Sequence, residues 1–184
     1  MINKLNWILL FLLFPTLGYA NIQCTESSWN DNLTQFNRLE SNYNKHVKVF
    51  NTLLADHNQR QLLSQIFSLH ELVLLWRSQS NKNVFQSQLK ASIQYREELT
   101  DTANELITFS TQSKWSANSW KKLAQKCLES NEVAITNQIS AEWYHTNALQ
   151  LADDYTRLSS QYLALAQQYD KEARALQYAQ DVSK

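Results

Sequence analysis

Apolar residues in the first part of the chain recur with alternating spacings of four and three. This spacing places one apolar stripe on a helix and is typical of the seam of a coiled-coil-like bundle. The stripe comprises Trp29, Leu33, Phe36, Glu40, Tyr43, Val47, Phe50, Leu54 and His57. From Leu54 the spacing becomes a run of fours through Asn58, Leu62 and Ile66, a slip that unwinds a supercoil locally without ending a helix. We predict one helix over about 25–78, with a turn at 56–58 as the alternative.

Two further stripes follow, and polar segments separate them. Residues 78–83 are all polar and include good helix N-caps, so a loop is expected there. The second stripe weakens over 110–119, where a break is the alternative, and it comprises Phe85, Leu89, Ser92, Arg96, Leu99, Ala103, Leu106, Ser110, Ser113, Ala117, Trp120, Ala124 and Cys127. After a turn at 129–132, the third stripe comprises Tyr144, Ala148, Leu151, Tyr155, Leu158, Tyr162, Leu165, Tyr169, Glu172 and Leu176. These stripes predict helices over about 83–128 and 132–180.

Glycine and proline are almost absent from the chain. The single glycine and the single proline, Gly18 and Pro15, both lie in the first twenty residues. An average chain of this length would carry about twenty of the two together. Sheets and tight hairpins need these residues at their turns, whereas helices need neither. The sequence therefore predicts an all-α protein.

The first twenty residues have the layout of a secretory signal peptide. A positive start at Lys4 precedes an apolar run over 7–14, and small residues at Gly18 and Ala20 prepare a cut after Ala20. The run is too short for a membrane span of about 20 residues. Lipidation at Cys24 is the competing hypothesis, although residues 21–23 match a lipobox poorly. We expect a periplasmic or secreted protein with residues 21–184 as one helical domain.

The two cysteines, Cys24 and Cys127, choose between topologies. An oxidising compartment favours a disulfide between them, and a disulfide requires Cα atoms within about 7 Å. Four shorter helices, with breaks near 57 and near 110–119, would put the two cysteines at opposite ends of the bundle. Three long helices running up, down and up bring them together. We predict this elongated three-helix bundle with coiled-coil-like seams, about 70–80 Å long, and keep the four-helix bundle as the alternative.

The charge and the missing glycines exclude several functions. Without Lys4 the chain has 16 basic and 17 acidic side chains, so nothing in its charge calls for nucleic acid. Phosphate-binding loops and nucleophile elbows need glycine at strained turns. There is no C-x-x-C-H haem motif, and the only methionine is Met1. We expect neither a cofactor nor catalytic activity.

One metal-ligand spacing is present. Glu142 and His145 share a helix face, but di-iron bundles need two such pairs and two more carboxylates. A ligand- or metal-binding bundle that recruits His46 or His57 from the first helix is the alternative to a non-catalytic interaction protein. His70 lies in an apolar run and is expected in the core.

Two groups of residues are candidate interaction surfaces. Trp115, Trp120, Lys121 and Lys122 combine aromatic and basic groups, which suits peripheral membrane contact or an anionic envelope polymer, unless Trp120 fills the core. Tyrosine at seam positions needs a partner for its hydroxyl, so a second set forms either the core or a surface for a partner helix. That set is Tyr155, Tyr162 and Tyr169.

These observations favour an exported helical bundle that acts as an adaptor, spacer or chaperone-like surface. Its expected partners are proteins of the cell envelope or a second copy of the chain. The sequence alone does not choose among them, because a bundle fold is compatible with many functions.

Overall fold

The computed structural model describes residues 23–129 and 134–183. The described part is mostly helical and has no strand, so the all-α prediction is confirmed. The helices are α1 (Glu26–Gln59), α2 (Leu63–Ile66), α3 (Leu69–Arg77), α4 (Gln79–Leu128) and α5 (Ala134–Val182). The proposed signal peptide lies outside the described residues. None of the described helices is both long and apolar enough to cross a membrane.

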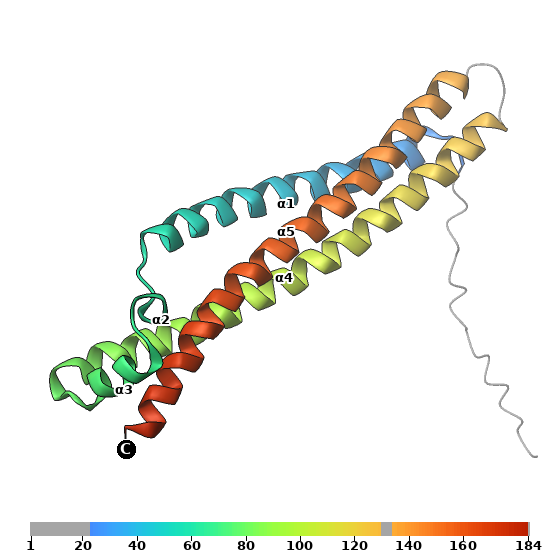
Figure 1. Ribbon diagram of the computed structural model, residues 1–184. Helices are drawn as coiled ribbons and strands as arrows, with labels where there is room; N and C mark the ends of the chain where they lie inside the picture. The colour runs from blue at the N-terminus through green and yellow to red at the C-terminus, as the bar shows by residue number, and fades with distance from the viewer. Residues whose placement is uncertain (1–22, 130–133, 184) are drawn as a thin grey trace, which may run out of the picture.

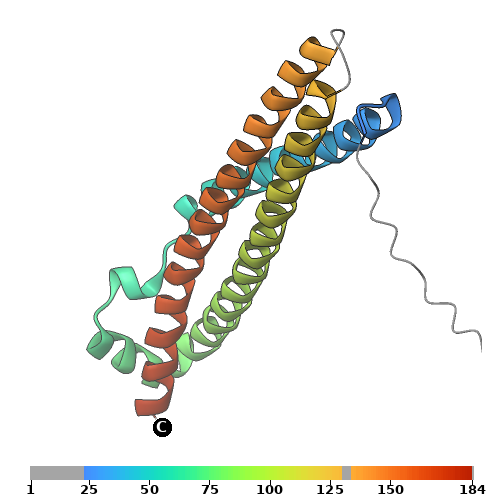
Figure 2. The same ribbon diagram turned by 90° about the vertical axis from the view of Figure 1, so that its right-hand side faces the viewer.

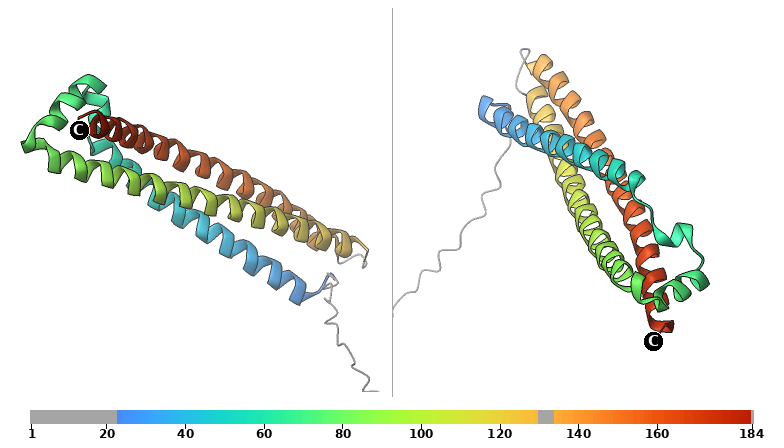
Figure 3. Two further views of the ribbon diagram at one scale, coloured as in Figure 1. Left: turned by 90° about the horizontal axis from the view of Figure 1, so that it is seen from below. Right: turned by 90° about the vertical axis from the view of Figure 1, so that its left-hand side faces the viewer.

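Helices α4 and α5 form a long antiparallel hairpin, against which the other helices lie (Figure 1). With 50 residues, α4 is about 75 Å long, as predicted. Helix α1 crosses the hairpin obliquely and runs in the same general direction as α5 (Figure 2). The short helices α2 and α3 cover the hairpin beside the C-terminus of the chain (Figure 3). The bundle is therefore an elongated up-down-up arrangement, and its first helical segment is divided into α1, α2 and α3.

The hairpin is held together by small residues on its two facing surfaces. Their short side chains let the two backbones approach, and serine hydroxyls then reach the opposite main chain. The hydroxyl of Ser110 donates to the carbonyl oxygen of Ala152 at 2.8 Å, and that of Ser159 donates to the carbonyl oxygen of Ala103 at 2.8 Å. Buried small residues recur every seven positions on each helix: Ala103, Ser110, Ala117 and Ala124 on α4, and Ala152, Ser159, Ala166 and Ala173 on α5.

Aromatic residues seat α1 on α5 in a regular register. Tyr43, Phe50 and His57 of α1 are seven residues apart, and each ring contacts the tyrosine 112 positions further along. The ring centroids of these pairs lie 4.8–5.3 Å apart, a spacing favourable for aromatic contacts. The partners on α5 are Tyr155, Tyr162 and Tyr169. Two parallel helices with the same heptad period keep this match over three repeats.

The predicted helix over 25–78 is wrong because the chain leaves the helical conformation twice. Arg60 and Phe67 are extended, with φ/ψ of −92°/125° and −115°/142°. The carboxylate of Glu172 on α5 binds the amides that start α2, accepting from the backbone nitrogens of Leu63 at 2.9 Å and Ser64 at 2.7 Å. The run of residues spaced by four therefore marks a break in the helix, after which Leu62 packs into the core. The alternative turn at 56–58 is also wrong, because α1 continues through these residues.

The predicted loop over 78–83 shrinks to a single residue. Ser78 is extended, with φ/ψ of −75°/121°, and it both ends α3 and starts α4. One such residue suffices to reverse the chain, and the polar residues after it form the first turn of α4. No break occurs over 110–119, since α4 is continuous there.

The predicted disulfide is confirmed. Cys24 and Cys127 are bonded, with their Cα atoms 4.8 Å apart. The bond ties the start of α1 to the end of α4. The break after Gln59 does not disturb this pairing, because α2 and α3 continue toward the far end before the chain turns back into α4 (Figure 1).

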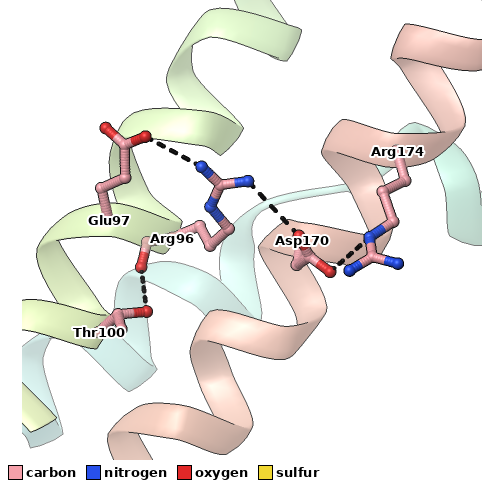
Figure 4. A network of polar contacts seen from close by, with 5 residues as sticks. All are labelled: Arg96, Glu97, Thr100, Asp170 and Arg174. Atoms are coloured by element: carbon pink, nitrogen blue, oxygen red, sulfur yellow. Dashed lines mark hydrogen bonds and ion pairs between the residues drawn. The ribbon is translucent and has the colours of Figure 1, made fainter.

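An ion-pair network joins α4 and α5 near the α3 end (Figure 4). Arg96 pairs with Asp170 at 3.5 Å and with Glu97 at 2.9 Å, and Arg174 pairs with Asp170 at 2.7 Å. The hydroxyl of Thr100 donates to the backbone oxygen of Arg96 at 2.7 Å. These groups are largely solvated, so the network fixes local geometry more than it stabilises the fold.

Candidate functional site

A groove lies between α1 and α4, and α5 forms part of its floor. Its volume is about 310 Å³. We call it the α1–α4 groove. Its lining residues are Lys45, His46, Val49 and Leu53 on α1, Tyr95, Glu98, Leu99 and Thr102 on α4, and Tyr162 on α5.

The groove exists because one position in a row of aromatic residues on α4 carries a small side chain. Tyr95, Thr102 and Phe109 are seven residues apart on α4 and project toward the same side of the helix. Phe109 contacts the ring of His46, at 5.8 Å between centroids, and Tyr95 contacts that of Tyr169, at 5.0 Å. Thr102 between them is too short to reach α1, so a hollow remains at its level.

Arg60 closes one end of the groove. Its guanidinium lies over the ring of Tyr95, 4.3 Å from the centroid, and donates a 2.9 Å hydrogen bond to the Tyr95 hydroxyl. It also lies 6.0 Å from the ring centroid of Tyr169. A second hollow of about 20 Å³ lies here and shares Leu53, Tyr95 and Leu99 with the groove. The site thus combines an apolar middle with a cation held at its end.

A second feature is an apolar surface at the disulfide end of the hairpin. We call it the end patch: Ile135, Ile139 and Trp143 on α5, each 56–61% exposed. Its three members are four residues apart, so they form one continuous stripe. Single exposed apolar residues are common on proteins, whereas a stripe of them marks an interaction surface.

Aromatic rings in mutual contact fill the interior behind the end patch. The rings of Trp120 and Tyr144 stack with centroids 4.4 Å apart, and Trp29 meets both edge-on. Asn32 is buried and accepts a 2.6 Å hydrogen bond from the hydroxyl of Ser119. Together with the disulfide, these contacts fix α1 against the hairpin at this end.

The candidate metal-binding pair of the alternative hypothesis, Glu142 and His145, is not assembled into a larger ligand set among the described residues. The Nδ1 atom of His145 lies 2.9 Å from the carbonyl oxygen of Ala117, an acceptor, so this nitrogen carries the proton. Glu142 accepts a 2.9 Å hydrogen bond from the side chain of Gln138. Across the described residues, no three His, Cys, Asp or Glu side chains gather closely enough to hold a metal ion. His70 is exposed, so its expected place in the core is wrong.

The predicted interaction residues divide into two groups. Trp115, Lys121 and Lys122 are exposed and free to meet a partner. The others face the interior, because α1 covers that side of the hairpin, and they do not form a surface: Trp120, Tyr155, Tyr162 and Tyr169, all at most 3% exposed.

The buried tyrosine hydroxyls find partners on α1. Tyr155 donates to the carbonyl oxygen of Leu39 at 2.7 Å, and Tyr162 donates to that of His46, seven residues later, at 3.3 Å. The hydroxyl of Tyr169 lies 3.3 Å from Nδ1 of His57. Burial raises the pKa of all three phenols above the usual value of 10. These groups are therefore structural and stay neutral.

His57 has the opposite shift. Burial lowers its pKa below 6.5, and the nearby charge of Arg60 lowers this pKa further. Since both effects disfavour the imidazolium, His57 is neutral at pH 7 and interacts with Tyr169 as an uncharged ring.

The sequence did not point to the residues that build the groove, among them Arg60 and Tyr95, nor to the capping role of Glu172. Arg60 falls where a continuous helix was predicted, and nothing there signals a stacked guanidinium. Glu172 did carry a signal, because a carboxylate in an apolar stripe must find partners when it is buried.

Comparison with known proteins returns no matching family model, curated sequence or solved structure. The described chain is an all-α bundle. Helices α4 and α5 form a hairpin that packs through small residues, and α1 lies against this hairpin and is linked to it by the disulfide. The described chain carries two candidate binding features, the α1–α4 groove and the end patch.

Proposed function

We propose that this protein is a non-catalytic adaptor of an exported compartment, which binds a protein partner through the end patch. The observation that carries the proposal is the stripe Ile135, Ile139 and Trp143, which is more than half exposed at one end of α5. A disulfide at the same end suits an oxidising compartment. Tryptophan is among the residues enriched in binding hot spots.

The surroundings of the patch favour a protein over a charged surface. The α5 residues between its members are mostly uncharged, namely Thr136, Asn137, Gln138, Ser140 and Ala141, with Glu142 as the one charge. Trp115, Lys121 and Lys122 lie on α4, outside the stripe. An apolar centre with an uncharged polar rim resembles the anatomy of protein–protein interfaces.

Photo-crosslinking in cells that export the protein tests this proposal. A photoreactive residue at Trp143 should give a discrete protein adduct whose mass identifies another protein or a second copy. The matched control is Val84, which is apolar, 63% exposed and near the opposite end of α4. Adding Ile135→Ser and Ile139→Ser should abolish the Trp143 adduct and leave unfolding unchanged, since both side chains are exposed. Lipid adducts alone, no adduct, or the same adduct from Val84 would contradict the proposal.

A further inference from the structure

We propose that the α1–α4 groove binds a small amphipathic molecule, composed of an apolar chain or ring and an anionic group. This site is separate from the end patch and does not depend on the adaptor function. Its volume of about 310 Å³ is in the range of small-molecule sites, which are mostly apolar with a few placed polar groups.

The floor and walls of the groove present carbon to a ligand. Leu99 and Tyr162 form a buried floor, and Val49 and Leu53 form the α1 wall. Val49 is 45% exposed although it faces a hollow lined by apolar groups. An apolar ligand body would cover this surface without moving the core.

Most polar groups around the groove already have partners within the protein. The Tyr162 hydroxyl donates to the carbonyl oxygen of His46, and the Tyr95 hydroxyl accepts from Arg60. Thr102 donates to the carbonyl oxygen of Glu98 at 2.9 Å, and the Glu98 carboxylate accepts from the side chain of Gln94 at 2.8 Å. A ligand therefore finds few hydrogen-bonding groups in the middle of the groove.

Lys45 is the charged lining group that remains available. Its ammonium forms no ion pair with any carboxylate of the described residues. Arg60, stacked at the opposite end, likewise has no carboxylate within ion-pair distance among them, although Asp56 lines the same small hollow. The Glu98 carboxylate is already hydrogen-bonded, whereas the Lys45 ammonium has no ion-pair partner among the described residues. The groove therefore favours a ligand with an anionic group beside Lys45.

Three probes with the same chain and different head groups test the charge: decanoate, decanol and decylamine. Each is titrated below its micelle concentration into the disulfide-bonded chain that follows the proposed cleavage site. Methyl NMR shifts of Val49, Leu53 and Leu99 report on the site, and calorimetry gives the affinity. We expect saturable shifts in these methyls, with decanoate binding more tightly than decanol and decylamine binding most weakly.

Charge variants sharpen the test. Lys45→Met keeps the apolar stem and should weaken decanoate about three- to fivefold, the scale of one exposed ion pair, without affecting decanol. Glu98→Gln should strengthen decanoate, because it removes the only carboxylate in the lining. A stronger response to decylamine than to decanoate, or an equal loss of decanol binding in Lys45→Met, would overturn the anionic assignment.

A filling variant locates the site. Val49→Trp should occupy the groove and abolish binding of all three probes, and its half-exposed position should keep the fold intact. The matched control is Lys48→Trp, on the exposed neighbouring position outside the lining, which should bind as the unaltered protein does. Absence of binding to the unaltered protein, or unchanged binding by a folded Val49→Trp variant, would refute the proposal.

Discussion

Replacing Glu172 by glutamine should destabilise the protein by about 2 kcal/mol. The carboxylate is fully buried and accepts three hydrogen bonds: from the amides of Leu63 and Ser64, and from the side chain of Gln88 at 3.2 Å. Helix α2 has no cap of its own, since its N-cap residue is Leu62. Glu172 therefore caps α2 from another helix.

The magnitude follows from what glutamine can replace. Glutamine has one carbonyl oxygen, so one of the two capping amides would face an NH₂ group and lose its acceptor. A buried unsatisfied donor costs about 1–3 kcal/mol, and bonds to a charged acceptor contribute more than neutral ones. The lower desolvation cost of the neutral amide offsets part of this loss, which leaves about 2 kcal/mol.

Urea unfolding followed by circular dichroism at 222 nm measures this change. Hydrogen exchange at the amide of Leu63 or of Ser64 should accelerate in Glu172→Gln, because one of these two donors loses its acceptor. The control is Glu142→Gln, an exposed carboxylate bonded to Gln138, which should change stability by less than about 0.5 kcal/mol. Equal effects of the two substitutions, or unchanged exchange at the two amides, would refute the capping role.

Three further predictions concern the core, the disulfide and pH. Leu158→Ala should cost about 2–5 kcal/mol in urea unfolding, since Leu158 is buried, whereas a much smaller loss would place it outside the core. Removing the disulfide with Cys24→Ser and Cys127→Ser should lower the free energy of unfolding by about 2–5 kcal/mol, because the bond links residues 103 positions apart. Mass spectrometry of the unaltered, non-reduced chain should show this link, and two free thiols would contradict it. Below pH 6.5 the unfolded chain protonates at His57 more readily than the folded chain, so the free energy of unfolding should fall as the pH is lowered. A His57 pKa at or above 6.5 in an NMR titration of the folded protein would contradict this. His57→Gln should weaken that loss between pH 7 and pH 5.

The sequence showed which face of each helix is apolar, but not which other helix packs against that face. The heptads containing Tyr43 and Tyr155 were both visible, and their period explains why each helix is continuous there. The offset of 112 residues that pairs them was not visible, because a stripe shows which side is apolar and not which helix covers it. The cysteine pair supplied the missing long-range information at one end only.

The break after α1 shows a different limit. A run of fours is compatible with a continuous helix, and no glycine or proline marks the extended residues Arg60 and Phe67. What ends the helix is tertiary: burial of Leu62, and a carboxylate supplied from α5 more than a hundred residues away. Local propensity carries no trace of such a cap, so the groove end at Arg60 could not be predicted.

Side-chain size explains why the groove lies between α1 and α4. Small residues such as Ala103 and Ser159 let α4 and α5 approach until hydroxyls bond across to the main chain. On the α1 side, tyrosines seven residues apart fill the contact with α5, so α1 is held at the distance of a ring pair. Helix α4 offers rings at Tyr95 and Phe109 but only a threonine at 102, so the distance set by α5 leaves space there. The groove is therefore a consequence of the register that seats α1, and a filling residue at Thr102 should close it as Val49→Trp does.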